Sequence, residues 1–192
     1  KGRERKVGSI GQPLPDVAVK IIDPDGKELP VNEVGELIVR GANISMGYYR
    51  MPDKTAETFV DGWLYTGDMA KIDEDGYIFI VDRKKDLIIR GGFNILPRDI
   101  EEVLHQHPAV MEAAVIGVPD RIMGEEVKCC LVISPGATVT EAEIIEHCRA
   151  HLAKYKCPKY VSFMTALPRN PIGKILKKAL REMSSHEHPA GS

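Results

Sequence analysis

The segment Asp82-Arg-Lys-Lys-Asp86, followed by Leu87-Ile-Ile-Arg90 and the pair Gly91-Gly92, decides how the fold of this chain is divided. Before this segment, short apolar runs are separated by closely spaced turns, which is typical of small β structures. After it, apolar runs of strand length alternate with segments of helical periodicity. The run of five charged residues is therefore predicted to be the boundary between two parts of different architecture.

Residues 1–83 are predicted to form a β-rich subdomain, a small distorted barrel. Val17, Val19 and Ile21 follow a period of two, which indicates a strand. The next segment, Asp23-Pro-Asp-Gly26, is a turn signal, because its proline presets φ and its glycine tolerates a positive φ. The other expected elements are a strand at 36–40, a short helix at 52–58, and a hairpin that pairs 69–72 with 77–81.

Residues 84–185 are predicted to form a compact α+β domain, which makes the whole chain α+β, and residues 186–192 a tail. The clearest local signal is Thr140 followed by Glu143, the spacing of a capping box at a helix start. The expected helices are 97–106, 140–154 and 174–183, and the expected strands are 113–118, 127–133 and 160–164.

The composition excludes several classes of function. With 43% apolar and 28% charged residues, the chain can fill a core, so intrinsic disorder is not expected. No run approaches the roughly 20 apolar residues of a membrane-spanning helix, so no integral membrane segment is expected. The net charge is -2, and no basic block is interleaved with aromatic residues, so no nucleic-acid partner is predicted.

The amino-terminal residues indicate whether the chain carries a targeting segment, and the cysteines indicate its cellular compartment. The segment Lys1-Gly-Arg-Glu-Arg-Lys6 resembles neither a signal peptide nor a transit helix, and we expect the chain to be a piece of a longer one. Its four cysteines contain no C-x-x-C pair, so we expect reduced, partly buried thiols in a cytoplasmic protein. They are Cys129, Cys130, Cys148 and Cys157. The six histidines lack a ligand spacing, so no metal is assigned to them.

Four segments, in order, carry a resemblance that covers nearly the whole chain. They are Gly35-Glu-Leu with Gly47-Tyr-Tyr and Pro52; Gly62-Trp-Leu-Tyr-Thr-Gly-Asp68; Asp82 to Glu101; and Pro168-Arg-Asn-Pro-Ile-Gly-Lys174. Together they resemble the later motifs of the adenylate-forming superfamily, which includes acyl-CoA synthetases, peptide-synthetase adenylation domains and firefly luciferase. Asp82 to Ile95 and His151 to Lys156 most resemble the fatty-acid–CoA ligase branch.

The resemblance assigns nucleotide binding to Asp68 and Arg83. A carboxylate has two acceptor oxygens, which suit the two hydroxyls of a ribose. Asp68 resembles the family residue that holds the ribose of ATP, and Arg83 the arginine that orients the nucleotide. The alternatives are an aspartate that caps a turn and a solvated arginine in the linker.

The resemblance also assigns a catalytic lysine and a hinge. Lys174 matches the family lysine that places positive charge on the α-phosphate and the attacking carboxylate as charge develops. It is equally a plausible target for a lysine acetyltransferase, which would neutralise it. Lys85 matches the hinge, where the backbone adopts two conformations; its alternative is a solvated charge. The other basic residues of the last helix, Lys177, Lys178 and Arg181, are expected on a solvated face.

The predicted CoA-binding residues are Gly91, Gly92, Tyr155, Lys159 and Met123. Paired glycines permit positive φ and leave room for a passing chain, and in the family this loop lines the pantetheine tunnel. Tyr155 resembles an aromatic that stacks on the CoA adenine, and Lys159 a base near its phosphates. Cys157 stands where many relatives carry arginine. For Tyr155 and Met123 the alternative is core packing. For the two glycines the alternative is a plain hairpin turn. Glu101 resembles the acid that ends this family motif, and its alternative is a solvated position.

The family's phosphate loop, the acid that helps to hold Mg²⁺ and the acyl pocket have no counterpart in this sequence. The resemblance therefore implies a carboxyl-terminal part of a ligase that uses a carboxylic acid, ATP and CoA, with AMP as product and a homodimeric parent as one option. Mg²⁺ ligands are expected upstream, and the chain alone is expected to be inactive. Alternatives are an aryl-acid ligase, a carrier-protein adenylation domain, a non-catalytic binding or assembly module, and an artificially truncated piece.

Overall fold

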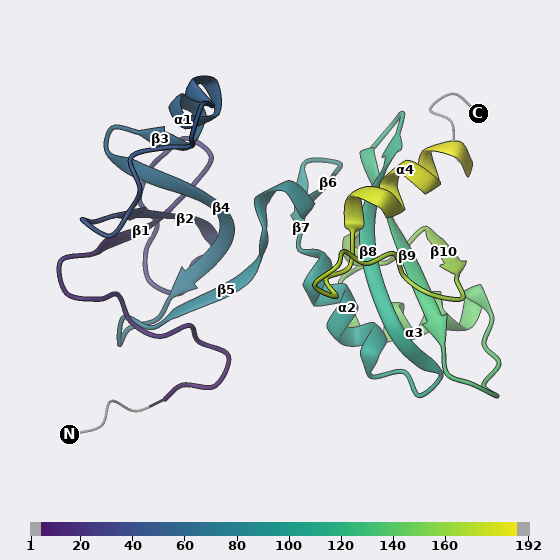
Figure 1. Cartoon of the computed structure of the whole chain (residues 1–192). Helices are drawn as coiled ribbons and strands as arrows, with labels where there is room; N and C mark the ends of the chain where they lie inside the picture. The colour runs from purple at the N-terminus through teal and green to yellow at the C-terminus, as the bar shows by residue number, and fades with distance from the viewer. Residues whose placement is uncertain (1–4, 188–192) are drawn as a thin grey trace. The chain divides into compact units, whose positions relative to one another are not determined.

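A five-stranded sheet organises the first unit, which ends at Lys85 (Figure 1). In this computed structural model, which describes residues 5–187, the strand order is β1-β2-β4-β3, and β5 also pairs with β4. The elements are β1 (Ala18–Ile22), β2 (Gly35–Arg40), α1 (Pro52–Thr58), β3 (Phe59–Val60), β4 (Trp63–Ile72) and β5 (Ile78–Arg83). The long strand β4 pairs with three neighbours, so it is the element that curls this sheet.

The core of the first unit is small, and one predicted boundary in it was wrong. Ile21, Leu37, Ala70 and Ile78 are its buried centre. Strand β4 begins at Trp63, six positions before the predicted start at Met69. Gly67 and Asp68 are poor strand formers and lie at a register shift of the pairing with β2, but β2 pairs with β4 on both sides of them and β3 pairs with its first two residues. The pairing with distant strands therefore overrides the local signal.

The second unit begins at Asp86, within the short turn η1 (Lys84–Asp86). Its sheet has the order β10-β9-β6-β7, with β8 paired to β9. The strands are β6 (Ile88–Arg90), β7 (Phe93–Ile95), β8 (Val110–Asp120), β9 (Gly124–Ile133) and β10 (Tyr160–Phe163). The helical elements are α2 (Pro97–His105), α3 (Glu141–His151), η2 (Lys154–Lys156) and α4 (Lys177–Glu187). The α+β class expected from the sequence is confirmed.

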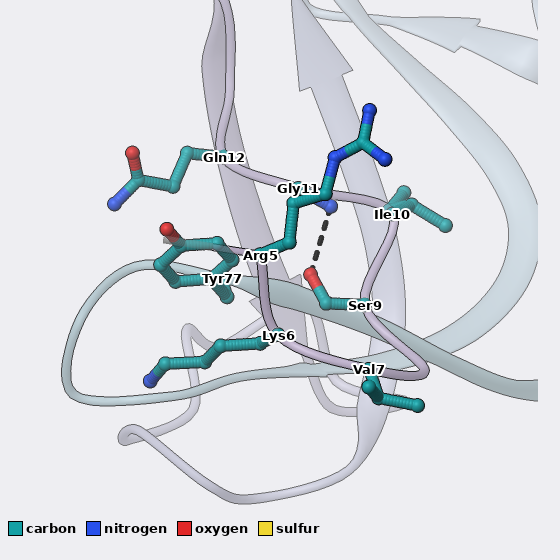
Figure 2. Close-up of a pocket in the computed structure, with 8 residues that line it drawn as sticks. All are labelled: Arg5, Lys6, Val7, Ser9, Ile10, Gly11, Gln12 and Tyr77. Atoms are coloured by element: carbon teal, nitrogen blue, oxygen red, sulfur yellow. Dashed lines mark hydrogen bonds between the residues drawn. The ribbon is translucent and has the colours of Figure 1, made fainter. Parts of the chain in front are cut away.

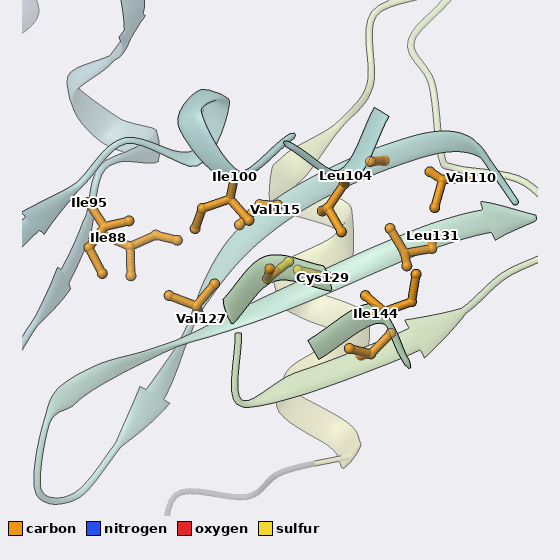
Figure 3. Close-up of a cluster of buried hydrophobic side chains, with 13 residues drawn as sticks. Ile88, Ile95, Ile100, Leu104, Val110, Val115, Val127, Cys129, Leu131 and Ile144 are labelled. Carbon is orange, nitrogen blue, oxygen red and sulfur yellow. The ribbon is translucent and has the colours of Figure 1, made fainter. Parts of the chain in front are cut away.

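Strands β8 and β9 are buried on both faces, and each face has its own cluster. On one face Val115 and Leu131 pack with Ile100 and Leu104 of α2 and with Ile144 of α3 (Figure 3). The opposite face carries a second cluster, which includes Ile116, Cys130, Val132 and Leu180 of α4. Burial on both faces explains why these strands read as continuous apolar runs rather than as alternating ones.

Helix boundaries in the second unit differ from the predicted ones at two places. Helix α3 begins with the predicted capping box at Thr140 but ends at His151, because Leu152 is extended and donates its N–H to the Cys148 carbonyl. Helix α4 begins at Lys177, so Lys174 precedes it. Helix α4 continues to Glu187, and residues 188–192 of the predicted tail lie outside the described residues.

The predicted solvated face of α4 was wrong for two of its three basic residues. Lys177 forms an ion pair with Glu101 at 2.8 Å, and Arg181 pairs with Asp86 at 2.9 Å. Only Lys178 among the three is well exposed, with a long contact to Glu182. The last helix is therefore bonded to α2 and to the start of the unit.

Two further properties concern the whole described chain. All four cysteines are free and buried, a deeper burial than expected. Burial raises the pKa of the Cys148 thiol to about 12 and that of Cys129 well above its ordinary value. Between residues 5 and 187 no helix is long and apolar enough to cross a membrane.

Removal of the Ile100 side chain is expected to destabilise the second unit. Ile100 is fully buried between α2 and the β8–β9 face, so Ile100→Ala should lower the free energy of unfolding by about 2–5 kcal/mol. The half-exposed Ile89 is the matched control, and Ile89→Ala should cost less than about 1 kcal/mol. Urea denaturation followed by circular dichroism measures both, and equal losses would contradict this packing.

Candidate functional site

Asp68 and Arg83 lie opposite each other where β4 pairs with β5. The Arg83 Nε donates to the Asp68 Oδ1 at 2.8 Å. The backbone N–H of Asp68 donates to the Thr66 hydroxyl, which itself donates to the Leu37 carbonyl. The structure thus brings together the two residues predicted to bind nucleotide. A carboxylate has acceptor capacity for a hydroxyl beyond one arginine contact, so the pair fits the ribose of an adenine nucleotide.

A small basic hollow adjoins this pair within the first unit. Its volume is about 340 Å³, and it is lined by Thr66, Gly67, Arg83, Lys84 and Lys85. Lys85, the predicted hinge residue, lies exposed in η1, where the two units divide. Among the described residues no group of three or more His, Cys, Asp or Glu side chains is placed to hold a metal ion.

Lys174 lies at the end of a tight turn that precedes α4. The Asn170 Oδ1 accepts the N–H of Ile172 at 3.2 Å and that of Lys174 at 2.8 Å, and Gly173 has a φ of +82°. The Arg169 guanidinium donates to the Gly173 carbonyl and to Glu112, each at 2.7 Å. The backbone of this turn is therefore held in place, while the Lys174 side chain extends into solvent.

The sequence contained a signal for this arrangement that the motif comparison did not use. Asn followed by Pro and Gly favours a turn in which the asparagine side chain bonds its own following backbone. Asn170 and Arg169 are the residues that fix Lys174, and both were quoted only as flanking letters of its motif.

Hydrogen bonds and an ion pair connect the predicted CoA residues. Gly91 bonds to Met123, and Asp120 links Met123 to Lys159. Arg90, which precedes Gly91 in the chain, bonds to the Tyr155 carbonyl. The Gly91 N–H donates to the Met123 carbonyl at 2.8 Å. The φ of +55° at Gly91 is rare for other residues and favours glycine, and a Cβ there would displace only the flexible end of the Met123 side chain, whose Cε would lie 2.7 Å away. Gly92 needs glycine for its φ of +83° alone, since its Cβ would meet nothing.

Asp120 links the Met123 loop to Lys159. Its Oδ1 accepts the N–H groups of Ile122 and Met123, each at 2.9 Å, and its Oδ2 lies 2.8 Å from the Lys159 Nζ. The Lys159 contact, aided by those two N–H groups, lowers the pKa of the Asp120 carboxyl to about 2. The same contact raises the pKa of the Lys159 ammonium. Any phosphate that approaches Lys159 must share it with Asp120.

Tyr155 stacks on Phe93, which follows the glycine pair. The ring centroids are 4.7 Å apart, and the planes make an angle of 23°. Tyr155 is 37% exposed and Phe93 is 54% exposed. The stacked pair is thus a surface aromatic platform rather than core packing. Phe93 and the strand β7 that carries it were not predicted.

The buried pair Arg90–Glu126 holds this CoA-side cluster together and was missed from the sequence. Arg90 donates to the carbonyls of Tyr155 at 2.9 Å and Cys157 at 3.3 Å. The Arg90 Nη2 donates to the Glu126 Oε1 at 3.3 Å, while the Arg90 Nε and the Glu126 Oε2 lie 2.7 Å apart as an ion pair without a hydrogen bond of their own. Both side chains are largely buried. Arg90 therefore fixes the backbone beneath Tyr155.

Glu101 has a structural role. Its Oε1 accepts the N–H of Val115 at 2.8 Å and lies 2.8 Å from the Lys177 Nζ. The alternative of a solvated residue was wrong, because Glu101 joins α2 to β8 and to α4.

A separate cavity in the first unit contains none of the predicted site residues (Figure 2). It has a volume of about 530 Å³ and is formed by 5–7, 9–12 and Tyr77. Within it the Ser9 hydroxyl accepts the Gly11 N–H at 2.8 Å. Its one lysine, Lys6, is paired with Asp73 and Asp75, and Arg5 also lines the cavity.

Two family models match the sequence. The model of AMP-binding enzymes matches residues 1–49, and that of the AMP-binding enzyme C-terminal domain matches residues 99–174. The second match ends at Lys174 and contains Met123, Tyr155 and Lys159. The Lys174 turn and the cluster of predicted CoA residues therefore both include residues of this matched region.

Curated relatives and solved structures agree with these models. A long-chain-fatty-acid–CoA ligase of Yersinia pestis is 48% identical over 91% of this chain and 31% of its own length. A 2-succinylbenzoate–CoA ligase of Bacillus cytotoxicus is 48% identical over 93% of this chain and 36% of its own. ATP-bound MatB from Rhodopseudomonas palustris has a TM-score of 0.89 at 46% identity, over 94% of this chain and 36% of that one. The chain thus spans about a third of the length of the relatives it matches.

Removal of Arg90 alone is expected to destabilise the fold much more than removal of Arg90 and Glu126 together. Arg90→Met leaves the buried Glu126 carboxylate with only the long contact of 3.8 Å to the Lys159 Nζ, which should cost up to about 3–5 kcal/mol of unfolding free energy. In Arg90→Met/Glu126→Leu no buried charge remains, so most of that loss should be recovered. Urea denaturation of both variants gives the comparison. If the double variant is no more stable than the single one, the buried charge is not the cause.

The ion pair of Asp120 with Lys159 predicts how the pKa of the Asp120 carboxyl responds when Lys159 is replaced. The depressed pKa means that the pair stabilises the fold above the ordinary carboxyl range and that this contribution is lost as the pH falls through about 2. In Lys159→Met the carboxyl pKa should rise from about 2 but stay below its ordinary value, because the two N–H donors remain. Carboxyl ¹³C NMR titration measures the shift. An unchanged pKa would exclude Lys159 as its main cause.

Proposed function

This chain belongs to the AMP-binding enzymes, and we propose that it is the carboxyl-terminal part of an acid–thiol ligase. The parent would activate a carboxylic acid with ATP, release pyrophosphate, and transfer the acyl group from acyl-AMP to CoA. The observation that carries this proposal is that one compact unit contains both an ordered turn with an exposed lysine and a separate glycine–aromatic cluster. Two chemical steps need two such groups.

For the first step, the chain would supply charge and nucleotide contacts. Lys174 has a backbone fixed by Asn170 and Arg169, so its ammonium can reach the α-phosphate from a defined origin. Positive charge there stabilises the charge that develops during attack of the carboxylate. Asp68, oriented by Arg83, would hold the ribose hydroxyls. Mg²⁺ would be bound by groups outside this chain and would neutralise phosphate charge when present.

For the second step, the chain would guide the thiol. The Gly91-Gly92 turn is closed onto the Met123 carbonyl and has no side chain to obstruct an extended pantetheine arm. The exposed ring of Tyr155 offers a face for an adenine. Lys85, between the units, would act as the pivot that brings first one group and then the other to the substrate.

For the acid itself we propose a fatty acid first and an aryl acid second. The segments Asp82 to Ile95 and His151 to Lys156 favour the fatty-acid branch. The two 48%-identical relatives, a fatty-acid ligase and a 2-succinylbenzoate ligase, support the two candidates equally. Because the remaining catalytic groups would lie upstream, we propose that residues 1–192 alone form no acyl-CoA.

The proposal is tested in a protein that carries this chain behind its upstream domain. Lys174→Gln should slow acyl-AMP formation, measured as pyrophosphate release with palmitate and with 2-succinylbenzoate, by about 100- to 1,000-fold. Acyl transfer from supplied acyl-AMP to CoA should change less than about threefold, because that step uses the other group. Lys178→Gln is the matched control. An equal loss in both steps, or no ligase activity with any acid, would contradict the proposal.

A further inference from the structure

The charged segment 82–86 is anchored in the first unit at its start. The Asp82 Oδ1 accepts the Arg83 N–H at 2.7 Å, and the Arg83 Nε donates to the Asp68 Oδ1 at 2.8 Å. Asp82 and Arg83 also lie opposite Met69 and Asp68 in the pairing of β5 with β4. The first two residues of the segment therefore move with the first sheet.

Lys84, the next residue, is held by a buried carboxylate of the same unit. Its Nζ donates to the Glu36 Oε2 at 2.6 Å, and the Glu36 side chain is only 8% exposed. Glu36 belongs to β2, where it lies opposite Met69 of β4. A carboxylate in such a position needs its cation, because an unpaired buried charge is costly. Lys84 is therefore fixed to the sheet of the first unit.

Asp86 is held in the same manner within the second unit. The Arg181 Nη2 of α4 donates to the Asp86 Oδ1 at 2.9 Å, and the Asp86 side chain is 13% exposed. Two positions further along, Ile88 is fully buried in the core of this unit and lies opposite Ile95 of β7. The chain is therefore fixed to the second unit from Asp86 onward.

Lys85 is the exception within the segment. Its side chain is exposed and forms no hydrogen bond or ion pair with any residue in 5–187. We propose that Glu36 and Arg181 are positioning residues, whose ion pairs with Lys84 and Asp86 confine the backbone movement between the units to Lys85. The part that this movement plays in ligation rests on the proposed function, whereas the confinement itself does not.

Confinement to one residue suits a unit that has to take two defined positions. A residue has only two soft backbone dihedral angles. Every additional residue with free dihedral angles adds conformational entropy, which is lost again each time the unit takes one position. The two flanking ion pairs, Glu36–Lys84 and Asp86–Arg181, therefore lower the entropic cost of each productive position.

Backbone ¹⁵N relaxation of the 192-residue chain tests the confinement. The order parameter should be about 0.85 at Lys84 and Asp86, as in a rigid backbone, and below about 0.6 at Lys85. Glu36→Gln should lower the value at Lys84 and leave that at Asp86 unchanged. Arg181→Gln should do the reverse, because each variant weakens one flanking ion pair and keeps the other.

The matched controls change the same kinds of charge at exposed positions. They are Glu33→Gln in the first unit and Lys178→Gln on α4, one turn before Arg181. If Arg181→Gln does not fold, as judged by circular dichroism, Asp86→Asn breaks the same ion pair without leaving an unpaired carboxylate. A rigid Lys85, equal mobility throughout 84–86, or variants that match their controls would overturn the proposal.

Kinetics of a protein that carries this chain behind its upstream domain separate the ion pairs from the function. Glu36→Gln should slow both pyrophosphate release and acyl transfer by roughly three- to tenfold, because both steps use the same pivot. Lys174→Gln, by contrast, should slow mainly the first step. A loss confined to one step would overturn the positioning role of Glu36. The expected relaxation changes without ligase activity on any acid would support the ion pairs and contradict the ligase.

Discussion

The antiparallel pairing of β8 with β9 is the constraint on which the second unit depends. It runs from Val110 opposite Ile133 to Asp120 opposite Gly124, and both faces are buried. Alternate residues of each strand enter different clusters, one under α2 and α3 and the other under α4. A slip of one residue would exchange the two faces and misplace three helices at once. The register of this pair therefore fixes where every helix of the unit packs.

The parts of the fold that were predictable carry their signal locally. The Thr140 capping box, the proline-led helices α1 and α2 and the apolar runs of β8 and β9 depend on residues close in sequence. The misses depend on how strands pair. Strand β4 extends to Trp63 because β2 and β3 pair with it there, with Val39 opposite Leu64 and Val60 opposite Trp63. The three-residue strand β7 forms a short hairpin with β6, in which Ile88 lies opposite Ile95, and no alternation over so few residues marks it in the sequence.

The candidate site residues also differ in whether the sequence alone could reveal them. Motif spacing singled out Lys174, Asp68 and the glycine pair as candidates, yet it did not reveal Arg90–Glu126 or Asp120–Lys159, whose members are 36 and 39 positions apart. A charged residue in a sequence looks the same whether it is solvated or paired. For that reason Lys177 and Arg181 were misassigned to a solvated face. Only the fold decides which lysines and arginines remain free for a ligand.

The two candidate groups of the second unit are attached to opposite ends of the β8–β9 ribbon. Glu112, near one end, holds Arg169 and with it the Lys174 turn; Asp120, at the other end, holds Lys159 and the Met123 loop. Glu112 and Asp120 are eight positions apart along β8, which corresponds to roughly 27 Å. A close-packed ribbon buried on both faces cannot shorten this separation. Under the function proposed above, one acyl group would therefore meet Lys174 and the Gly91-Gly92 loop only in turn, which is why that proposal requires a pivot at Lys85.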